Sequence, residues 1–200
     1  MSRIDNEVNK MSFLSDYFPF HQKTLNLVIA SIMIALVCVA TIFFQIPIAV
    51  TGGYFNVGEA IIYISALVFG PIIGGLAGGI GAALADAMSP YFIFAPGTLV
   101  IKFCEGFIIG FIVYRVHLLE WKKWKIYSIY IIAVVTGGII MVIGYFIYEA
   151  FILALGIPFA LVEIPFNLTQ LLIGALFAIP ASIAIQETYP IKEFPSKKID

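Results

Sequence analysis

The sequence predicts an all-α membrane protein with six transmembrane helices and with both termini in the cytoplasm. The first observation is the composition: 62% of the 200 residues are hydrophobic and 12% are charged, whereas about a quarter of the residues in a soluble domain are charged. The mean hydropathy is +1.04, so the chain lacks the polar surface that a soluble domain needs. The other two observations are the lengths of the apolar stretches and the placement of the basic residues between them.

Five apolar stretches stand out in the sequence, and a helix needs about 20 residues to cross a membrane. The second stretch, 60–85, contains Gly70-Pro71 near its middle. Glycine followed by proline commonly ends one helix and starts another. This stretch is therefore either one kinked span or two short spans.

The basic residues decide between five and six spans. Of the eleven Lys and Arg residues, three precede the first stretch, four lie in the connection 115–125, three follow the last stretch, and Lys102 lies within a span. Six spans place these three clusters on one side, which the positive-inside rule makes cytoplasmic, whereas five spans separate them. We therefore expect a cytoplasmic segment 1–24, a six-helix domain 25–186 in the cell membrane and a cytoplasmic tail 187–200. The expected spans are about 25–45, 57–70, 71–87, 97–115, 126–150 and 164–186.

Ionisable residues at membrane depth cost a few kcal/mol each on insertion scales, so each needs a reason. In the six-span topology all of them map to the outward half of the bundle or to its rim, whereas the cytoplasmic halves contain almost no charge. The sequence therefore predicts a polar pocket that is open to the outside above an apolar, closed floor. The ionisable candidates are Glu59, Asp86, Lys102, Glu105, Glu149 and Glu163, and the amide candidates are Asn56, Asn167 and Gln170.

Structural roles are the alternative for several of these residues. Asn56 and Glu59 have the spacing of a capping box, in which Glu59 folds back onto the start of its helix. Asp86 and Glu149 lie near helix ends, where solvation at the rim would explain them. Glu163 would only complement the N-terminus of a helix that begins near Pro165.

Lys102 and Glu105 are three residues apart on one helical face, so they could simply neutralise each other. A buried ion pair contributes little to stability, however, and recognition of a ligand is the interpretation we favour. Because of their depth, we expect the first contacts to a ligand from Lys102, Glu105, Asn167 and Gln170.

Three tyrosines are well placed to contact a flat ring, although most aromatic residues of this chain must meet lipid or fill the bundle. Tyr54 lies in a glycine-rich outward connection that could close over a ligand. Tyr91 lies in the next outward connection, and Tyr145 lies four residues before Glu149 on the same helical face.

Small residues recur at every fourth position in two places. Gly70, Gly74, Gly78 and Ala82 form the longer stripe. Ser31 and Ala35 form a small-xxx-small pair on the first span, with Ala30 beside it. Such stripes let helices approach closely in lipid, either within the bundle or against a second membrane subunit.

Other function classes lack their motifs in this sequence. There is no Walker loop for ATP hydrolysis and no H-E-x-x-H or Cys/His cluster for a metal. The formal net charge of −1 gives no sign of a nucleic-acid partner. We therefore expect a binding protein without catalysis, cofactor or metal.

Several runs of the sequence resemble the substrate-binding S components of energy-coupling factor transporters, in the branch called riboflavin-type. The first runs are 51–60 (TGGYFNVGEA), 69–71 (FGP) and 78–86 (GGIGAALAD). The later runs are 95–98 (APGT) with Lys102 and Glu105, and 165–167 (PFN) with Gln170. The resemblance covers about residues 25–186.

The resemblance implies a six-helix subunit that captures a vitamin or related micronutrient outside the cell. It also implies two kinds of partner, a membrane coupling subunit and two cytoplasmic ATPases, with inward release after the subunit topples in the bilayer. In this family a small-xxx-small pair on the first helix contacts the coupling subunit, and Ser31 and Ala35 match it. The pocket of the family corresponds loosely to the polar candidates above.

Two other functions remain open from the sequence. One is a self-sufficient carrier that is coupled to protons through Glu105 or Asp86, and the other is a purely structural membrane subunit. For a binding subunit, five carboxylates against one lysine favour a neutral or weakly cationic heterocycle with hydroxyl or amino groups. Riboflavin, pyridoxine, hydroxymethylpyrimidine and thiamine all fit this description.

Overall fold

A computed structural model describes residues 19–48, 53–117 and 123–188 of the chain. Most of the expected N-terminal segment, residues 49–52 of the first outward connection, residues 118–122 of the basic connection and the C-terminal tail lie outside the described residues. The elements, in chain order, are α2 (Pro19–Phe43), β1 (Ile46–Ile48), β2 (Gly53–Phe55), α3 (Gly58–Phe69), α4 (Pro71–Leu76), the π-helical turn η1 (Ala77–Gly81), α5 (Ala82–Ala87), α6 (Ala95–His117), α7 (Lys123–Ile147), the π-helical turn η2 (Tyr148–Ile152) and α8 (Ile157–Thr188).

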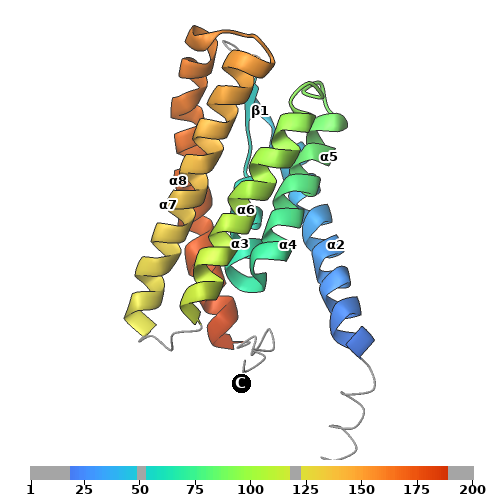
Figure 1. Cartoon of the computed structure of the whole chain (residues 1–200), viewed down its shortest axis with the longest axis vertical. Helices are drawn as coiled ribbons and strands as arrows, with labels where there is room; N and C mark the ends of the chain where they lie inside the picture. Colours follow the sequence, from blue (N-terminus) through green and yellow to red (C-terminus); the bar gives the residue numbers. More distant parts are fainter. Residues whose placement is uncertain (1–18, 49–52, 118–122, 189–200) are drawn as a thin grey trace, which may run out of the picture.

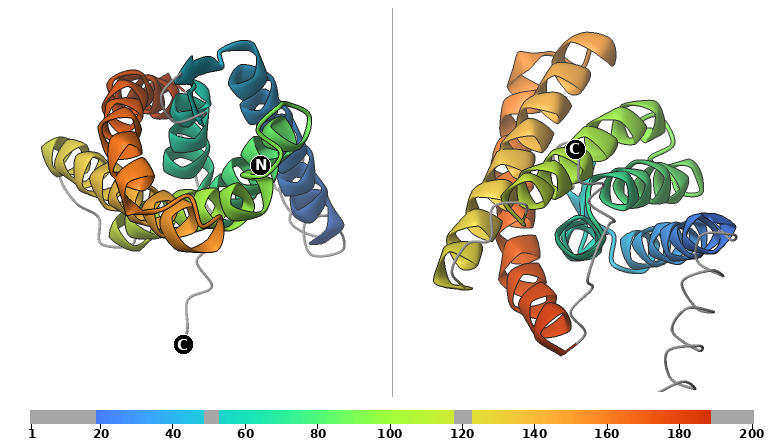
Figure 2. Two further views of the ribbon diagram at one scale, coloured as in Figure 1. Left: turned by 90° about the horizontal axis from the view of Figure 1, so that it is seen from above. Right: turned by 60° about the horizontal axis from the view of Figure 1, so that its bottom comes forward.

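The helices run up and down the long axis of the bundle (Figure 1). The start of α2 and the end of α8 lie at one end, which we call the lower end. The β1–β2 hairpin and the connections 88–94 and 153–156 lie toward the opposite, upper end. Seen from above, α3 lies between α2 and α8, and it packs against both (Figure 2).

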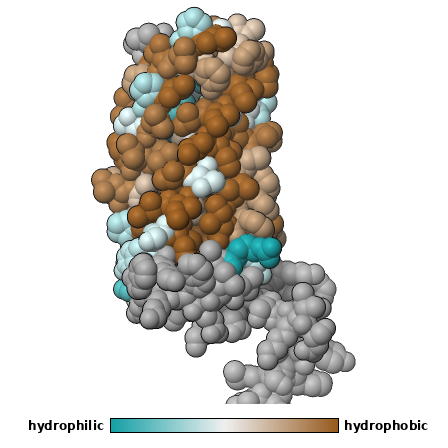
Figure 3. All heavy atoms as spheres, turned by 60° about the vertical axis from the view of Figure 1, so that its left-hand side comes forward, coloured by the Kyte–Doolittle hydropathy of each residue, from teal (hydrophilic) through white to brown (hydrophobic). Residues whose placement is uncertain are grey.

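Four helices are long and apolar enough to cross a membrane among the described residues: Thr24–Phe43, Ala95–Arg115, Ile126–Ile152 and Ile157–Thr188. Gly58–Phe69 and Pro71–Ala87 are shorter apolar helices. Large apolar side chains such as Ile132, Leu172 and Phe177 are exposed on this bundle, and the face drawn in Figure 3 is hydrophobic over most of its height. Such a surface is typical of contact with lipid.

The expected break at Gly70-Pro71 is present. Gly70 has a φ of 84°, a conformation that glycine adopts without the steric cost of a Cβ. Pro71 follows as the first residue of α4, where its missing N–H costs no helical hydrogen bond. The chain therefore reverses direction here, and 60–85 forms two antiparallel segments.

The stripe of small residues on α4 and η1 packs inside the bundle. A Cβ added at Gly74 would lie 2.6 Å from the Cα of Ala66 on α3, and one added at Gly78 would lie 2.6 Å from the carbonyl oxygen of Lys102 on α6. These contacts are with backbone, which cannot give way as a flexible side chain can. Of the two interpretations of this stripe, the structure therefore supports close helix packing within the chain.

The lower half of the interior is apolar and closed. Its fully buried side chains include Ile62, Leu67 and Ile109. The hydroxyl of Tyr130 donates to Gln186, whose own amide donates to the carbonyl oxygen of Leu67 at 3.0 Å. The polar groups of this half are therefore few, and they lie within a mainly apolar core.

The last helix starts earlier than the sequence suggested. It begins at Ile157 and continues through Pro165, so Glu163 lies within it and does not mark its start. The actual start follows Gly156, with a φ of 91°, and has Pro158 in its first turn. Pro165 costs one backbone hydrogen bond, which membrane helices tolerate, and the hydroxyl of Thr169 donates to its carbonyl oxygen at 2.8 Å.

Candidate functional site

A polar cavity lies at the upper end, between the hairpin, α5, α6, α7, η2 and α8. Its enclosed volume is about 40 Å³. Drug-sized ligands occupy pockets of about 300–1,000 Å³, so the enclosed part must widen to accept a vitamin. The lining residues are Gly53, Tyr54, Asn56, Asp86, Phe94, Thr98, Tyr145, Glu149, Glu163, Asn167 and Gln170.

The β1–β2 hairpin closes one side of this cavity. Its strands pair antiparallel, with Pro47 opposite Tyr54, and the Tyr54 hydroxyl donates to Oδ1 of Asp86 on α5. Burial and the nearby Asp86 carboxylate raise the pKa of the Tyr54 phenol, so this hydroxyl stays protonated and donates. The rings of Tyr54 and Tyr91 lie with their centroids 4.4 Å apart. Tyr54 therefore ties the hairpin to two neighbouring segments.

The absence of a side chain at Gly53 lets the hairpin approach α8. A Cβ at this position would lie 2.5 Å from a carboxylate oxygen of Glu163. On the wall between α6 and α7, the hydroxyls of Thr98 and Tyr145 lie 3.0 Å apart and share a hydrogen bond. The cavity is therefore bounded by hydrogen-bonding groups from segments that are far apart in the sequence.

Gln170 forms the floor of the cavity and connects three segments. Its carbonyl oxygen accepts from the backbone N–H of Asn56 at 3.2 Å and from the side-chain amide of Asn56 at 3.3 Å. Its own amide nitrogen donates to Oε2 of Glu59 at 2.9 Å. This side chain therefore links the end of the hairpin, α3 and α8.

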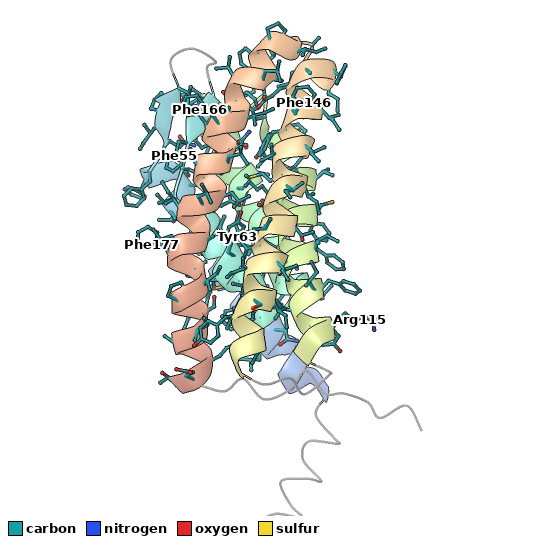
Figure 4. The ribbon with its side chains drawn as sticks, turned by 90° about the vertical axis from the view of Figure 1, so that its left-hand side faces the viewer. Phe55, Tyr63, Arg115, Phe146, Phe166 and Phe177 are labelled. Carbon is teal, nitrogen blue, oxygen red and sulfur yellow. The ribbon has the colours of Figure 1, made fainter. Side chains whose placement is uncertain are left out.

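A buried ion cluster, consisting of Glu59, Lys102 and Glu105, lies directly beneath this floor. The Lys102 ammonium contacts Oε2 of Glu59 and lies 3.0 Å from Oε2 of Glu105. The hydroxyl of Tyr63 donates to the other oxygen of Glu105 at 3.1 Å, and Figure 4 shows Tyr63 in the interior between α7 and α8. All three residues are at most 2% exposed. Ionisable groups that are buried this deeply are costly unless they are paired, and here they pair with one another.

The lining above this cluster is acidic. Asp86, Glu149 and Glu163 are each at most 4% exposed, and no basic side chain lines the cavity within the described ranges. Oε2 of Glu149 is buried without a hydrogen-bond partner. Glu149 lies in η2, and π-helical turns of this kind are frequent at functional sites.

The structure brings most of the predicted site residues together. Seven of the ten line the cavity: Tyr54, Asn56, Asp86, Tyr145, Glu149, Asn167 and Gln170. Glu163 also lines it, as one of the ionisable candidates. The other predicted residues, Glu59, Lys102 and Glu105, lie beneath the floor and contact one another.

The geometry of the buried ion cluster bears on two expectations about these residues. Lys102 and Glu105 were expected among the first ligand contacts, but their charged groups are turned toward each other and toward Glu59, because a buried charge requires a partner. Glu59 does not fold back to complete a capping box. Its carboxylate points inward to Lys102, and the side chain of Asn56 accepts from the N–H of Gly58 at 2.9 Å.

Sequence reasoning missed Phe94 and Thr98 as members of the lining. Thr98 lies one helical turn before Lys102 on α6, so it shares the inward face with that residue. This spacing is a signal that could have identified it. Phe94 lies in an irregular connection, where no periodic pattern indicates which side chains point inward.

The three small residues of α2 do not share one face. Ser31 and Ala35 are exposed, and the Ser31 hydroxyl donates to the carbonyl oxygen of Leu27 at 2.9 Å. Ala30, which was expected on the partner surface, is only 5% exposed and belongs to the apolar core. Adjacent residues of a helix lie about 100° apart around its axis, and Ala30 lies on the side of α2 that packs into the core, whereas Ser31 lies on the exposed side.

An apolar helical bundle with a buried polar cavity at one end is the arrangement of a membrane protein that binds a small polar molecule. The chain matches the family model described as "ECF-type riboflavin transporter, S component" over residues 21–187, and it belongs to that family. Members of this family are the substrate-binding membrane subunits of energy-coupling factor transporters, and they work with the module that supplies the energy.

One relative in the archaeon Pyrococcus woesei is described as "Uncharacterized protein in gap 3'region". It is 41% identical over 109 residues, which make up 54% of this chain and 68% of that protein. The match to the family model confirms the resemblance to S components that the sequence suggested. The description of the relative adds no information about the ligand.

Proposed function

We propose that this S component captures a water-soluble vitamin or related heterocycle in the polar cavity at its upper end. The observation that carries this proposal is the contrast between the two halves of the bundle. Hydrogen-bonding side chains line the upper cavity, whereas the interior below the ion cluster is apolar and packed. A cavity that is open at one end only suits capture from one side of the membrane.

The upper end faces the outside of the cell in this proposal, with six spans and both termini in the cytoplasm. Support comes from the basic residues, since Arg115 projects from the lower end of α6 (Figure 4) and the connection after it carries further lysines. The positive-inside rule makes that end cytoplasmic. The chain is then a multi-pass protein of the cell membrane.

The energy for import comes from partner subunits in this proposal, namely a membrane coupling subunit and two cytoplasmic ATPases. The exposed small residues Ser31 and Ala35 on α2 provide a surface on which a partner helix can approach closely. Ala30 is not part of this surface, because it faces the core.

The lining favours a neutral or weakly cationic ligand that donates hydrogen bonds. Carboxylates at Asp86, Glu149 and Glu163 accept hydrogen bonds, and the amides of Asn167 and Gln170 can both donate and accept them. The family name makes riboflavin one candidate, along with thiamine, pyridoxine and hydroxymethylpyrimidine. Flavin mononucleotide, which adds a phosphate to riboflavin, should be rejected because the cavity offers it no basic group.

The first experiment is mass spectrometry of small molecules that purify with the protein. It is followed by titration of the purified protein with a panel that consists of the four candidate heterocycles and flavin mononucleotide. We expect one heterocycle of the panel or one co-purified molecule to bind. Riboflavin and flavin mononucleotide form a matched pair for the charge argument. Concentrative uptake by vesicles that contain this chain alone would contradict the proposal and would favour a proton-coupled carrier.

Substitution of the two amides tests the location of the site. Asn167→Ala and Gln170→Ala should each weaken binding by about 5- to 150-fold, because a ligand group that loses its hydrogen-bonding partner in the cavity is left unsatisfied at a cost of about 1–3 kcal/mol. Thr169→Ala is the matched control, since this exposed residue bonds only to the backbone of its own helix. If both amide variants bind within about twofold of the parent protein, the assignment of the cavity is wrong.

A further inference from the structure

The cavity gathers more carboxyl groups than the chain around it can pair with basic side chains. Five carboxyl groups lie in or directly beneath it, namely Glu59, Asp86, Glu105, Glu149 and Glu163. The only basic residue between 24 and 114 is Lys102, and 126–191 contains none. Since Lys102 contacts both Glu59 and Glu105, its charge is already compensated.

We propose that Glu149 and Glu163 hold a positively charged nitrogen of the substrate, so that this S component selects cationic heterocycles or amines over neutral ones. The inference rests on the proposed function, because it assigns a substrate class to the same cavity. It adds that the missing positive charge is supplied by the ligand and that these two carboxylates recognise it.

Glu149 provides the main structural evidence. It is 4% exposed, it lines the cavity, and its Oε2 atom is buried without a hydrogen-bond donor among the described residues. A buried carboxylate is stable when it is paired with a cation or supplied with donors. An ammonium or a cationic ring nitrogen in the cavity would satisfy this oxygen.

Glu163 approaches the same space from α8. It is also 4% exposed and lines the same cavity. Two like charges in a medium of low dielectric constant destabilise each other, and a cation between them removes the repulsion. A neutral ligand could donate hydrogen bonds to both groups but would leave the repulsion in place.

The remaining lining suits a ring that bears such a charge. The aromatic side chains of Tyr54, Phe94 and Tyr145 border the cavity, and aromatic faces attract cations. Asn167 and Gln170 offer hydrogen bonds to the neutral substituents of the ring. The substrate class is therefore a cationic nitrogen heterocycle, or an aromatic amine that is protonated near neutral pH.

The test compares ligands that differ mainly in charge. Pyridoxamine carries an ammonium group where pyridoxine carries a hydroxyl, so this pair tests the charge at nearly constant size. Hydroxymethylpyrimidine and its aminomethyl analogue form a second pair that differs in the same way. Isothermal titration of the purified parent protein at pH 7 should show a preference of about tenfold or more for the cationic member of at least one pair. This comparison needs no variant.

Glu149→Gln and Glu163→Gln test whether these two carboxylates cause the preference for the cationic ligand, because each substitution removes the charge and keeps the shape of the side chain. Each should weaken binding of the cationic ligand by about tenfold and change binding of the neutral ligand by less than about threefold. Glu187→Gln is the matched control, because this exposed glutamate lies on α8, as Glu163 does, but at the lower end of the helix. The empty Glu149→Gln protein should also melt at a higher temperature than the parent, because it buries one charge fewer.

The possible failures can be told apart. If neutral ligands bind the parent protein as tightly as cationic ones, or if the co-purified molecule has no basic or quaternary nitrogen, the charge inference is overturned and the proposed function stands. If Glu149→Gln weakens both members of a pair equally, the carboxylate is not a charge selector. If no molecule binds or purifies with the protein, the proposed function itself fails.

Discussion

At the scale of single residues, the interior is organised by how each buried charge is satisfied. Lys102 is held between Glu59 and Glu105, and Tyr63 donates to Oε1 of Glu105, the oxygen that does not contact Lys102. Together with Gln170, which donates to Glu59, these contacts form a fixed polar layer below the cavity. The layer separates the part of the interior that can exchange ligand from the apolar part that holds the helices together.

Removal of the central cation should destabilise the protein strongly. Lys102→Met leaves two buried carboxylates facing each other without a cation, and we expect a loss of about 3–5 kcal/mol in the free energy of unfolding. Arg115→Met is the control, because Arg115 is exposed and its guanidinium carbon lies over the ring of Phe111, 5.6 Å from the ring centroid.

Thermal unfolding of the detergent-solubilised variants measures this effect. A second substitution should restore part of the stability without restoring the lysine. The double variant Lys102→Met, Glu59→Gln removes one of the two unpaired charges and should melt between the single variant and the parent. Equal melting temperatures for Lys102→Met and Arg115→Met would mean that the cluster is not energetically significant.

At the scale of elements, the hairpin is the part that most directly limits access to the cavity. Its strands contain three residues each, and an isolated two-stranded hairpin is marginally stable at best. The hairpin is held by side chains at its second strand, through Tyr54 to Asp86 and through Asn56 to Gln170. Access to the cavity is therefore controlled by a few hydrogen bonds.

Tyr54→Phe should make the cavity easier to open while leaving the fold intact. The substitution keeps the ring against Tyr91 and removes the hydroxyl that donates to Asp86, a net loss of about 0.5–1.5 kcal/mol, or up to about 3 for a bond to a charged group. We expect faster release of bound ligand, measured by stopped-flow displacement. Tyr127→Phe, at an exposed position near the lower end of α7, should leave the release rate unchanged. A slower release from Tyr54→Phe would show that the hydroxyl holds the cavity open.

At the scale of the whole molecule, the functions of binding and of energy coupling map to different surfaces. The ligand cavity is enclosed by the hairpin and by α5 to α8, whereas Ser31 and Ala35 lie on the outside of α2. A change at the outer face of α2 can therefore affect assembly without altering the cavity.

Ser31→Leu or Ala35→Leu should preserve ligand binding and abolish uptake. A bulky side chain at either position holds a partner helix away from α2, whereas the cavity lies elsewhere in the bundle. Uptake by cells that contain the complete transporter, measured beside ligand titration of the purified subunit, separates the two effects. Val135→Leu, on the exposed face of α7, is the control and should affect neither. Equal loss of binding and uptake would mean that these residues serve the packing of the subunit itself.

The sequence by itself determined the class of structure and the end of the bundle at which polar groups gather. Hydropathy and span length are local properties of the chain, and so is the break at Gly70-Pro71, where the backbone conformation depends on two adjacent residues. The polar candidates could be found because each charge at membrane depth is costly and therefore informative.

Only the tertiary structure decided which of these residues face the cavity and which face each other. The partner of Lys102 on α3, Glu59, is 43 residues away in the sequence, and Gln170 meets Asn56 across 114 residues. Such pairs depend on how each helix is rotated and how closely its neighbours approach, which the glycines of α4 and η1 set through backbone contacts with α3 and α6. The periodicity of one helix gives the direction of a side chain but not the group that it meets, so the acidic lining and the buried ion cluster became distinct only when the helices were packed together.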